Sequence, residues 1–109
     1  MAEEWDWELQ QAQTAYTVSE LLKDGVKEGG TITLDFSFKA AEGADRTALE
    51  KALVMFGYEL GDEGAEFTAS ISDIDFSLES IWTHEERTTK MALARGFEPD
   101  GWGFWEPSK

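Results

Sequence analysis

Residues 32–39 alternate strictly between apolar and polar side chains, and this pattern constrains the fold more than any other feature of the chain. The apolar members are Ile32, Leu34, Phe36 and Phe38. Because successive side chains of a strand point to opposite faces of a sheet, the alternation predicts a strand with one buried face. Other parts of the chain must cover that face.

Apolar residues at helical spacing predict a helix on either side of this strand. The first helix is expected over about residues 6–24. Its apolar stripe comprises Trp5, Leu9, Ala12, Tyr16, Leu21 and Leu22. The second follows a loop at 41–45 and ends at Gly57, and Thr47 and Glu50 stand at capping-box spacing near its start. The residues it is expected to bury are Leu49, Ala52, Leu53 and Phe56.

The rest of the chain predicts three more strands and one more helix. Residues 58–60 and 67–76 read as a strand pair joined by the turn-rich segment 61–65. Apolar residues change parity between Ile71 and Ile74, which favours a bulge near Ser72 and Asp73. A helix follows over Ser77–Arg95 and ends at Gly96. The last predicted element is a strand over Phe97–Trp105.

This order predicts an α+β fold of the ferredoxin-like split βαβ type, an antiparallel βαββαβ sheet preceded by an extra N-terminal helix. The length of 109 residues fits a single domain, with the extra helix in residues 1–25 and the ferredoxin-like core in residues 31–107.

The helix predicted over Ser77–Arg95 has an interrupted apolar stripe. Its apolar residues near one face are Leu78, Ile81, Trp82 and Ala92. The residues that interrupt the stripe are Glu85, Thr88 and Thr89. Two interpretations stay open: the middle of this helix is loosely packed, or it meets a partner.

The charge of the chain bears on its partners. Nine Lys and Arg against 23 Asp and Glu give a net charge of −14, a field that repels nucleic-acid backbones and anionic lipid surfaces. The same field favours association with a basic protein surface, such as the Arg-rich segments of RNA-processing proteins. A role in solubility alone remains the alternative.

Other features of the composition concern the compartment. The chain has no cysteine, which excludes disulfides and thiolate metal sites and fits a reducing environment. Residues 1–6 are acidic and have no apolar run, so neither a signal peptide nor a membrane span is expected there. A cytoplasmic location is the expectation.

The sequence contains few residues in a pattern suited to catalysis. The one histidine, His84, has polar helical surroundings that predict an exposed surface residue without a partner nucleophile. No phosphate-binding loop, EF-hand or zinc-protease motif is present. The chain is therefore expected not to be an enzyme and to need no cofactor. The enzyme hypothesis requires at least two of four acids to converge in a cleft. These are Asp73, Asp75, Glu98 and Asp100.

The C-terminal segment 97–107 is unusually aromatic. On a strand, Trp102 and Phe104 face one way and Trp105 the other, so one set is expected to be core. Either the rings simply pack, helped by the small Gly101 and Gly103, or one ring is an exposed binding anchor surrounded by acids. The candidates for protein binding are Trp82, Glu98, Asp100, Gly101, Trp102, Gly103, Trp105 and Glu106.

Three stretches resemble the regulators of ribonuclease E activity, type B. They are Glu20–Gly25, Thr47–Ala52 continuing through Phe56–Glu59, and Asp100–Gly103 followed by Glu106 and Pro107. Their order spans residues 20–107, and the Asp-Gly-Trp-Gly element at 100–103 is the most specific part. The polar middle of the 77–95 helix and the short connection at 61–65 depart from the family.

The resemblance implies a ferredoxin-like domain that binds the endoribonuclease of the bacterial RNA degradosome. It further implies inhibition of RNA cleavage, chiefly through the non-catalytic scaffold region of the enzyme, with no catalytic residue in this chain. The alternative is an uncharacterised module of the same fold that binds another protein or a small ligand. A concave apolar pocket lined by Trp82, Trp102 or Trp105 would favour a ligand.

Overall fold

The structure is a computed structural model that describes residues 5–63 and 66–105. Within these residues it contains three helices and four strands. Their order is α1 (Trp7–Lys23), β1 (Thr31–Ala40), α2 (Arg46–Met55), β2 (Glu59–Glu63), β3 (Glu66–Asp75), α3 (Leu78–Leu93) and β4 (Phe97–Trp105). The elements expected from periodicity are thus present, with boundaries that differ by a few residues.

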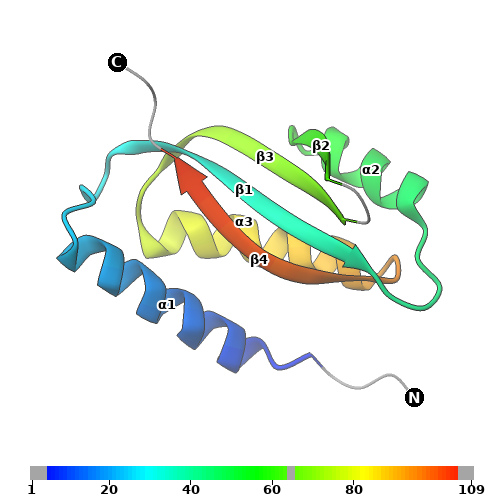
Figure 1. Ribbon diagram of the computed structural model, residues 1–109, viewed down its shortest axis with the longest axis horizontal. Helices are drawn as coiled ribbons and strands as arrows, with labels where there is room; N and C mark the ends of the chain where they lie inside the picture. Colours follow the sequence, from blue (N-terminus) through cyan, green and yellow to red (C-terminus); the bar gives the residue numbers. More distant parts are fainter. Residues whose placement is uncertain (1–4, 64–65, 106–109) are drawn as a thin grey trace.

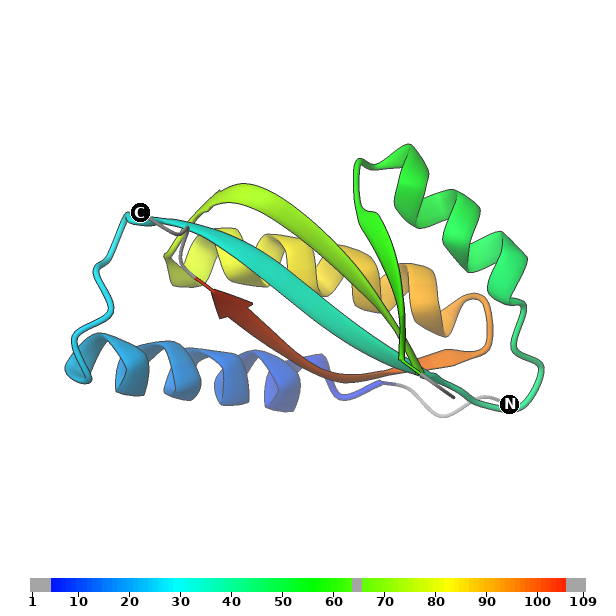
Figure 2. The ribbon, with the colours of Figure 1, turned by 45° about the horizontal axis from the view of Figure 1, so that its top comes forward.

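The four strands form one antiparallel sheet in the order β2-β3-β1-β4. Helix α3 packs against β1, β3 and β4, and α2 packs beside it against β2. Helix α1 contacts α3 and runs along the β4 edge of the sheet (Figures 1 and 2). The fold is therefore α+β, in an arrangement compatible with the ferredoxin-like type.

The alternation in β1 builds the core. Leu34, Phe36 and Phe38 are buried on the face that the helices cover, whereas Asp35 and Ser37 lie on the other face and are only partly buried. Phe38 packs on Phe67 of β3, with ring centroids 5.6 Å apart. Each large apolar side chain buried here contributes about 1.5–3 kcal/mol, so this face holds the sheet and helices together.

A bulge in β3 confirms the expected change of parity. Ile74 pairs with Ile32, but Ile71 pairs with Leu34, so β3 has one residue more than β1 in this interval. Asp73 lies inside it with φ of 63°, a left-handed conformation that Asp tolerates better than most residues. The bulge lets Ile71 and Ile74 both pack against the core despite their opposite parity.

The apolar stripe predicted for the first helix is wrong in its N-terminal part. Leu9 and Tyr16 are 54% and 68% exposed, while the buried residues of α1 are Thr14 and Val18. Leu21 and Leu22 pack against the core, as expected. The buried face includes a polar residue because the part of α3 that it meets is itself polar.

The hairpin between β2 and β3 is tighter than expected. Residues 61–63 were expected in a loop, but they continue β2 and pair with β3 as far as Glu63 opposite Glu66. Residues 64 and 65 of the expected turn lie outside the described residues.

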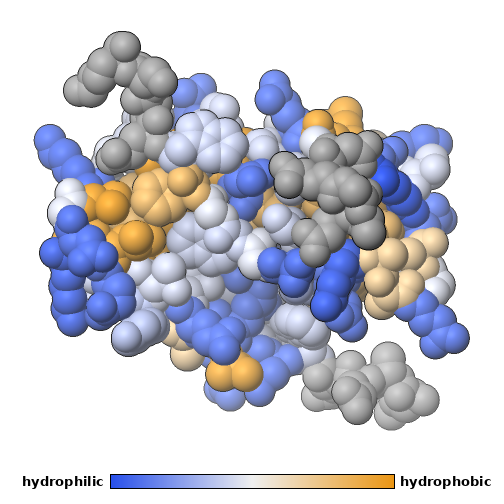
Figure 3. All heavy atoms as spheres, viewed as in Figure 1, coloured by the Kyte–Doolittle hydropathy of each residue, from blue (hydrophilic) through white to orange (hydrophobic). Residues whose placement is uncertain are grey.

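The surface is mainly hydrophilic on the side that presents the sheet. Figure 3 shows apolar residues gathered on this side over the region where α1 ends and β1 begins. None of the described helices is long and apolar enough to cross a membrane.

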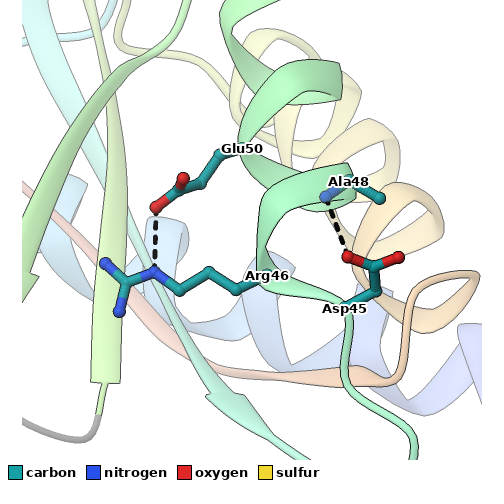
Figure 4. Close-up of polar contacts among 4 residues, drawn as sticks. All are labelled: Asp45, Arg46, Ala48 and Glu50. Carbon is teal, nitrogen blue, oxygen red and sulfur yellow. Dashed lines mark hydrogen bonds and ion pairs between the residues drawn. The ribbon is translucent and has the colours of Figure 1, made fainter.

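The start of α2 differs from the expected capping box. Asp45 is the N-cap, and its carboxylate accepts a hydrogen bond from the backbone N–H of Ala48 at 3.1 Å (Figure 4). Glu50 instead forms an ion pair with Arg46 at 2.8 Å. The prediction failed because Asp45 is as good an N-cap as Thr47 and comes earlier in the chain.

The end of α2 also differs from expectation. Leu49 and Leu53 are buried, but Phe56 is exposed. The guanidinium of Arg87 lies 5.2 Å from the centre of the Phe56 ring. Phe56 follows the last residue of the helix, so it no longer continues the buried stripe.

Candidate functional site

A bulge in β4 determines how the aromatic C-terminal strand meets the helices. Trp102 pairs with Phe36 and Pro99 with Phe38, so β4 has one residue more than β1 between these pairs. Gly101 lies in the bulge with φ of 106°, which L side chains rarely adopt. The bulge brings Pro99 and Trp102 to the same face of the sheet.

A pocket of about 610 Å³ lies where α1, α3 and the β1–β4 pair meet. Its surface is mostly apolar, and Trp5 and Trp102 both contribute to it. Gly101 of the bulge also lines it, together with Phe36 and Phe38 of β1. Ligand sites of proteins usually have about 300–1,000 Å³, so this pocket is large enough for a substantial chemical group.

Polar side chains of α1 and α3 meet at the wall of the pocket. Thr14 Oγ1 donates a hydrogen bond to Glu85 Oε1 at 2.5 Å, and Gln10 Nε2 donates one to Glu85 Oε2 at 2.9 Å. Gln10 Nε2 also lies 3.1 Å from the hydroxyl oxygen of Thr89. Trp5 Nε1 donates to Gln10 Oε1 at 2.6 Å, which fixes the amide of Gln10. We call Trp5, Gln10, Thr14, Glu85 and Thr89 the polar cluster.

Glu85 is the charged member of the polar cluster and is 7% exposed. Burial raises the pKa of its carboxyl group, and the hydrogen bonds from Thr14 and Gln10 oppose this rise. A carboxylate has about four acceptor sites, and these two bonds use one site on each oxygen. Capacity for a further donor remains.

The polar cluster explains the interrupted stripe of α3. Glu85, Thr88 and Thr89 are buried, and α1 supplies the groups that bind Glu85 and Thr89. Thr88 Oγ1 donates to the backbone carbonyl of His84 at 2.9 Å. The interpretation that the middle of this helix is loosely packed is therefore wrong. Glu85 and Thr89 contact α1 of the same chain.

The predicted element Asp100–Gly103 lies beside the pocket. Gly101 and Trp102 line it, and Trp102 also packs against the core. Asp100 and Gly103 are exposed next to them. A Cβ atom at Gly101 or Gly103 would meet nothing within 4 Å, so close approach of another element does not explain either glycine.

The other two tryptophan candidates lie elsewhere. Trp82 packs edge-to-face on Trp7 of α1, with ring centroids 6.3 Å apart, and lies outside the pocket lining. Trp105 is 52% exposed and pairs with Thr33, a residue on the sheet face that the helices leave open. The three tryptophans proposed as binding residues are therefore not brought together.

The acidic candidates lie in two separate places. Asp73 and Asp75 line a second, open pocket of about 370 Å³ together with His84, and the others belong to the opposite part of the sheet. Glu98 and Asp100 are exposed on β4, and Glu106 lies outside the described residues. Asp75 pairs with Thr31 at one end of β1, and Glu98 pairs with Lys39 near the other end. Thr31 and Lys39 are eight residues apart, so these two acids are separated by about 26 Å along the strand direction. In residues 5–63 and 66–105, no group of three or more acids or histidines is arranged to hold a metal ion.

The prediction that His84 is an exposed surface residue is wrong. The histidine is half-buried, and its Nδ1 lies 2.7 Å from the hydroxyl oxygen of Tyr58. Burial and then the positive charge of Arg87 lower the pKa of His84. The local sequence did not show this because Tyr58 comes from a distant segment.

Sequence reasoning also missed most of the pocket. Gln10 has no distinctive sequence context, and Glu85 is recognisable only as an interruption of the apolar stripe of its helix. The available signal was the pairing of polar residues at helical spacing on two helices, Gln10 with Thr14 and Glu85 with Thr89.

Comparison with protein-family models gives no match for this sequence, and comparison with curated proteins gives none either. The resemblance of the three stretches therefore remains a prediction, and the site is interpreted from its geometry.

Proposed function

We propose that this protein is a non-enzymatic regulator that binds a basic segment in the scaffold region of ribonuclease E and lowers its cleavage of RNA. One observation carries the proposal. The Asp-Gly-Trp-Gly element, the most specific part of the family resemblance, lies at the surface and forms a wall of the pocket through Gly101 and Trp102.

The charge supports a basic partner. A net charge of −14 speeds the encounter with a positively charged segment and disfavours direct contact with RNA. Binding of this kind weakens as salt screens the charges. The partner is thus expected to be a protein segment rich in Arg or Lys.

The element order supports the finer assignment of the fold. A helix followed by βαββαβ, with the sheet order β2-β3-β1-β4, is what the ferredoxin-like part of the resemblance implies. A single domain in the cytoplasm belongs to the same proposal.

Calorimetry with a purified scaffold fragment of ribonuclease E tests the proposal. At low salt the fragment is expected to bind, and at high salt its affinity is expected to fall. A fragment of the catalytic region is the matched control and is expected to bind weakly. Absence of binding by the scaffold fragment at low salt would contradict the proposal.

A second candidate function is the binding of a small ligand. It is favoured by the pocket itself, which is concave, mostly apolar and lined by Trp102. Native mass spectrometry of the purified protein tests it. A reproducible mass added to the chain, and lost on denaturation, would support this function over the first.

A further inference from the structure

The walls of the pocket combine one buried acid with two indole rings. Glu85 is the charged side chain among the buried residues that the structure describes. Trp5 and Trp102 come from different segments of the chain, one just before α1 and one on β4. Indole faces attract cations, and a guanidinium stacks on them better than an ammonium does.

The charges at the pocket favour a cation. Glu85 and Asp6 are among its lining residues, and none of the described lining residues is Lys or Arg. Asp6 is exposed and serves as the N-cap of α1, whereas Glu85 is buried, so Glu85 is the acid at which a cation in the pocket would be shielded from water. Burial of a charged carboxylate costs free energy, and a cation bound beside it offsets part of that cost.

The unused acceptor capacity of Glu85 suits a donor with two N–H groups. Thr14 and Gln10 each occupy one site on a different oxygen of Glu85, which leaves one site on each. A guanidinium donates two parallel N–H groups to the two oxygens of a carboxylate. Lys offers only a single charged point.

We propose that the pocket holds an arginine side chain of the basic partner segment, with Glu85 as its carboxylate partner and Trp5 and Trp102 as its walls. The proposal rests on the proposed function for the origin of that arginine in ribonuclease E. The chemistry of the pocket can be tested without that enzyme.

The test uses a short Gly/Ser peptide with one central Arg, and the same peptide with citrulline, its uncharged isostere. Each is titrated into the full chain while the indole signals of Trp5 and Trp102 and the amide signal of Gln10 are followed by NMR. The Arg peptide is expected to shift these three signals, and the citrulline peptide to bind about tenfold or more weakly. Equal binding of both peptides would overturn the proposal.

Variants locate the effect in the pocket. Glu85→Gln removes the negative charge and is expected to weaken the Arg peptide about tenfold or more. Leu9→Lys changes an exposed lining residue and needs no core repacking, so it is expected to weaken binding even if Glu85→Gln fails to fold. Met55→Lys is the matched control, because Met55 is 82% exposed on α2 and lies outside the pocket lining. An effect of Leu9→Lys no larger than that of Met55→Lys would overturn the proposal.

The two proposals fail in different ways. If the ribonuclease E fragment binds and Leu9→Lys does not weaken it, the proposed function stands and the arginine pocket is wrong. If the Arg peptide binds in the pocket and the fragment does not bind, the pocket stands and its partner is another protein.

Discussion

The hydroxyl of Thr14 on α1 donates a 2.5 Å hydrogen bond to the carboxylate of Glu85 on α3. Both residues are buried, and they lie 71 positions apart in the sequence. The first helix is therefore attached to the rest of the fold partly through polar groups, and the pocket depends on this attachment.

Thr14→Val keeps the shape of the side chain and removes the hydroxyl. We expect it to lower the free energy of unfolding by about 1–3 kcal/mol, because it removes a donor from a buried carboxylate. Thr14→Ser keeps the donor and is expected to cost less than Thr14→Val. Urea unfolding of the three proteins measures the difference, and equal stability of Thr14→Val and the parent chain would contradict the role of this bond.

Glu85→Gln is expected to change how stability depends on pH. Burial raises the pKa of Glu85 above its ordinary value of 4.5 in the folded protein. Its stabilising contribution is therefore complete below pH 4.5 and is lost as the pH rises through the raised pKa. The variant lacks this loss, so its stability relative to the parent chain should increase as the pH rises through that range.

Urea unfolding at a series of pH values checks this expectation for Glu85→Gln. Glu59→Gln makes the same change of charge at an exposed position on β2 and serves as control. A stability difference between Glu85→Gln and the parent chain that is constant with pH would contradict the raised pKa.

The histidine offers a direct spectroscopic test. The chain has one histidine, so its imidazole signals in an NMR titration need no further assignment. The pKa of His84 is expected below 6.5, chiefly because of burial and secondarily because of Arg87. Arg87→Met should raise this pKa while leaving it below 6.5, since burial remains.

The lowered pKa of His84 also has a consequence for stability. The neutral histidine contributes stability above pH 6.5, and that contribution is lost as the pH falls through the folded-state pKa. A measured pKa at or above 6.5 would contradict both the burial and the consequence.

Gly101→Ala tests the bulge that places Trp102 beside the pocket. A side chain at φ of 106° is strained although no neighbour lies within 4 Å, so we expect a loss of about 1–2 kcal/mol in stability. Gly103→Ala is the matched control, because Gly103 has equally open surroundings without a positive φ. Thermal unfolding measures both, and similar effects of the two changes would contradict the role assigned to the bulge.

The sheet was largely predictable from the sequence because its signals are local. The alternation in β1 gives its buried face, and the change of parity between Ile71 and Ile74 predicts the bulge that contains Asp73. The boundary of β2 was less predictable, because pairing with β3 extends the strand through residues of turn type.

The site was less predictable because it depends on contacts between distant segments. Hydrophobic periodicity predicts that Leu9 and Tyr16 lie on the buried side of α1. In the structure α1 contacts α3 through Thr14 and Gln10 instead. Which side of α1 is buried depends on the polar residues of α3, which lie more than 70 positions away in the sequence. The proximity of Trp102 to the pocket likewise depends on the β4 bulge.

The most direct test of the central claim measures the rate at which ribonuclease E cleaves RNA in the presence of this protein. Two enzymes are compared, the full-length enzyme and one that lacks the scaffold region. The account predicts that the protein lowers the rate of the full-length enzyme and leaves the truncated one nearly unchanged. An unchanged rate of the full-length enzyme at low salt, where charge attraction is strongest, would contradict it.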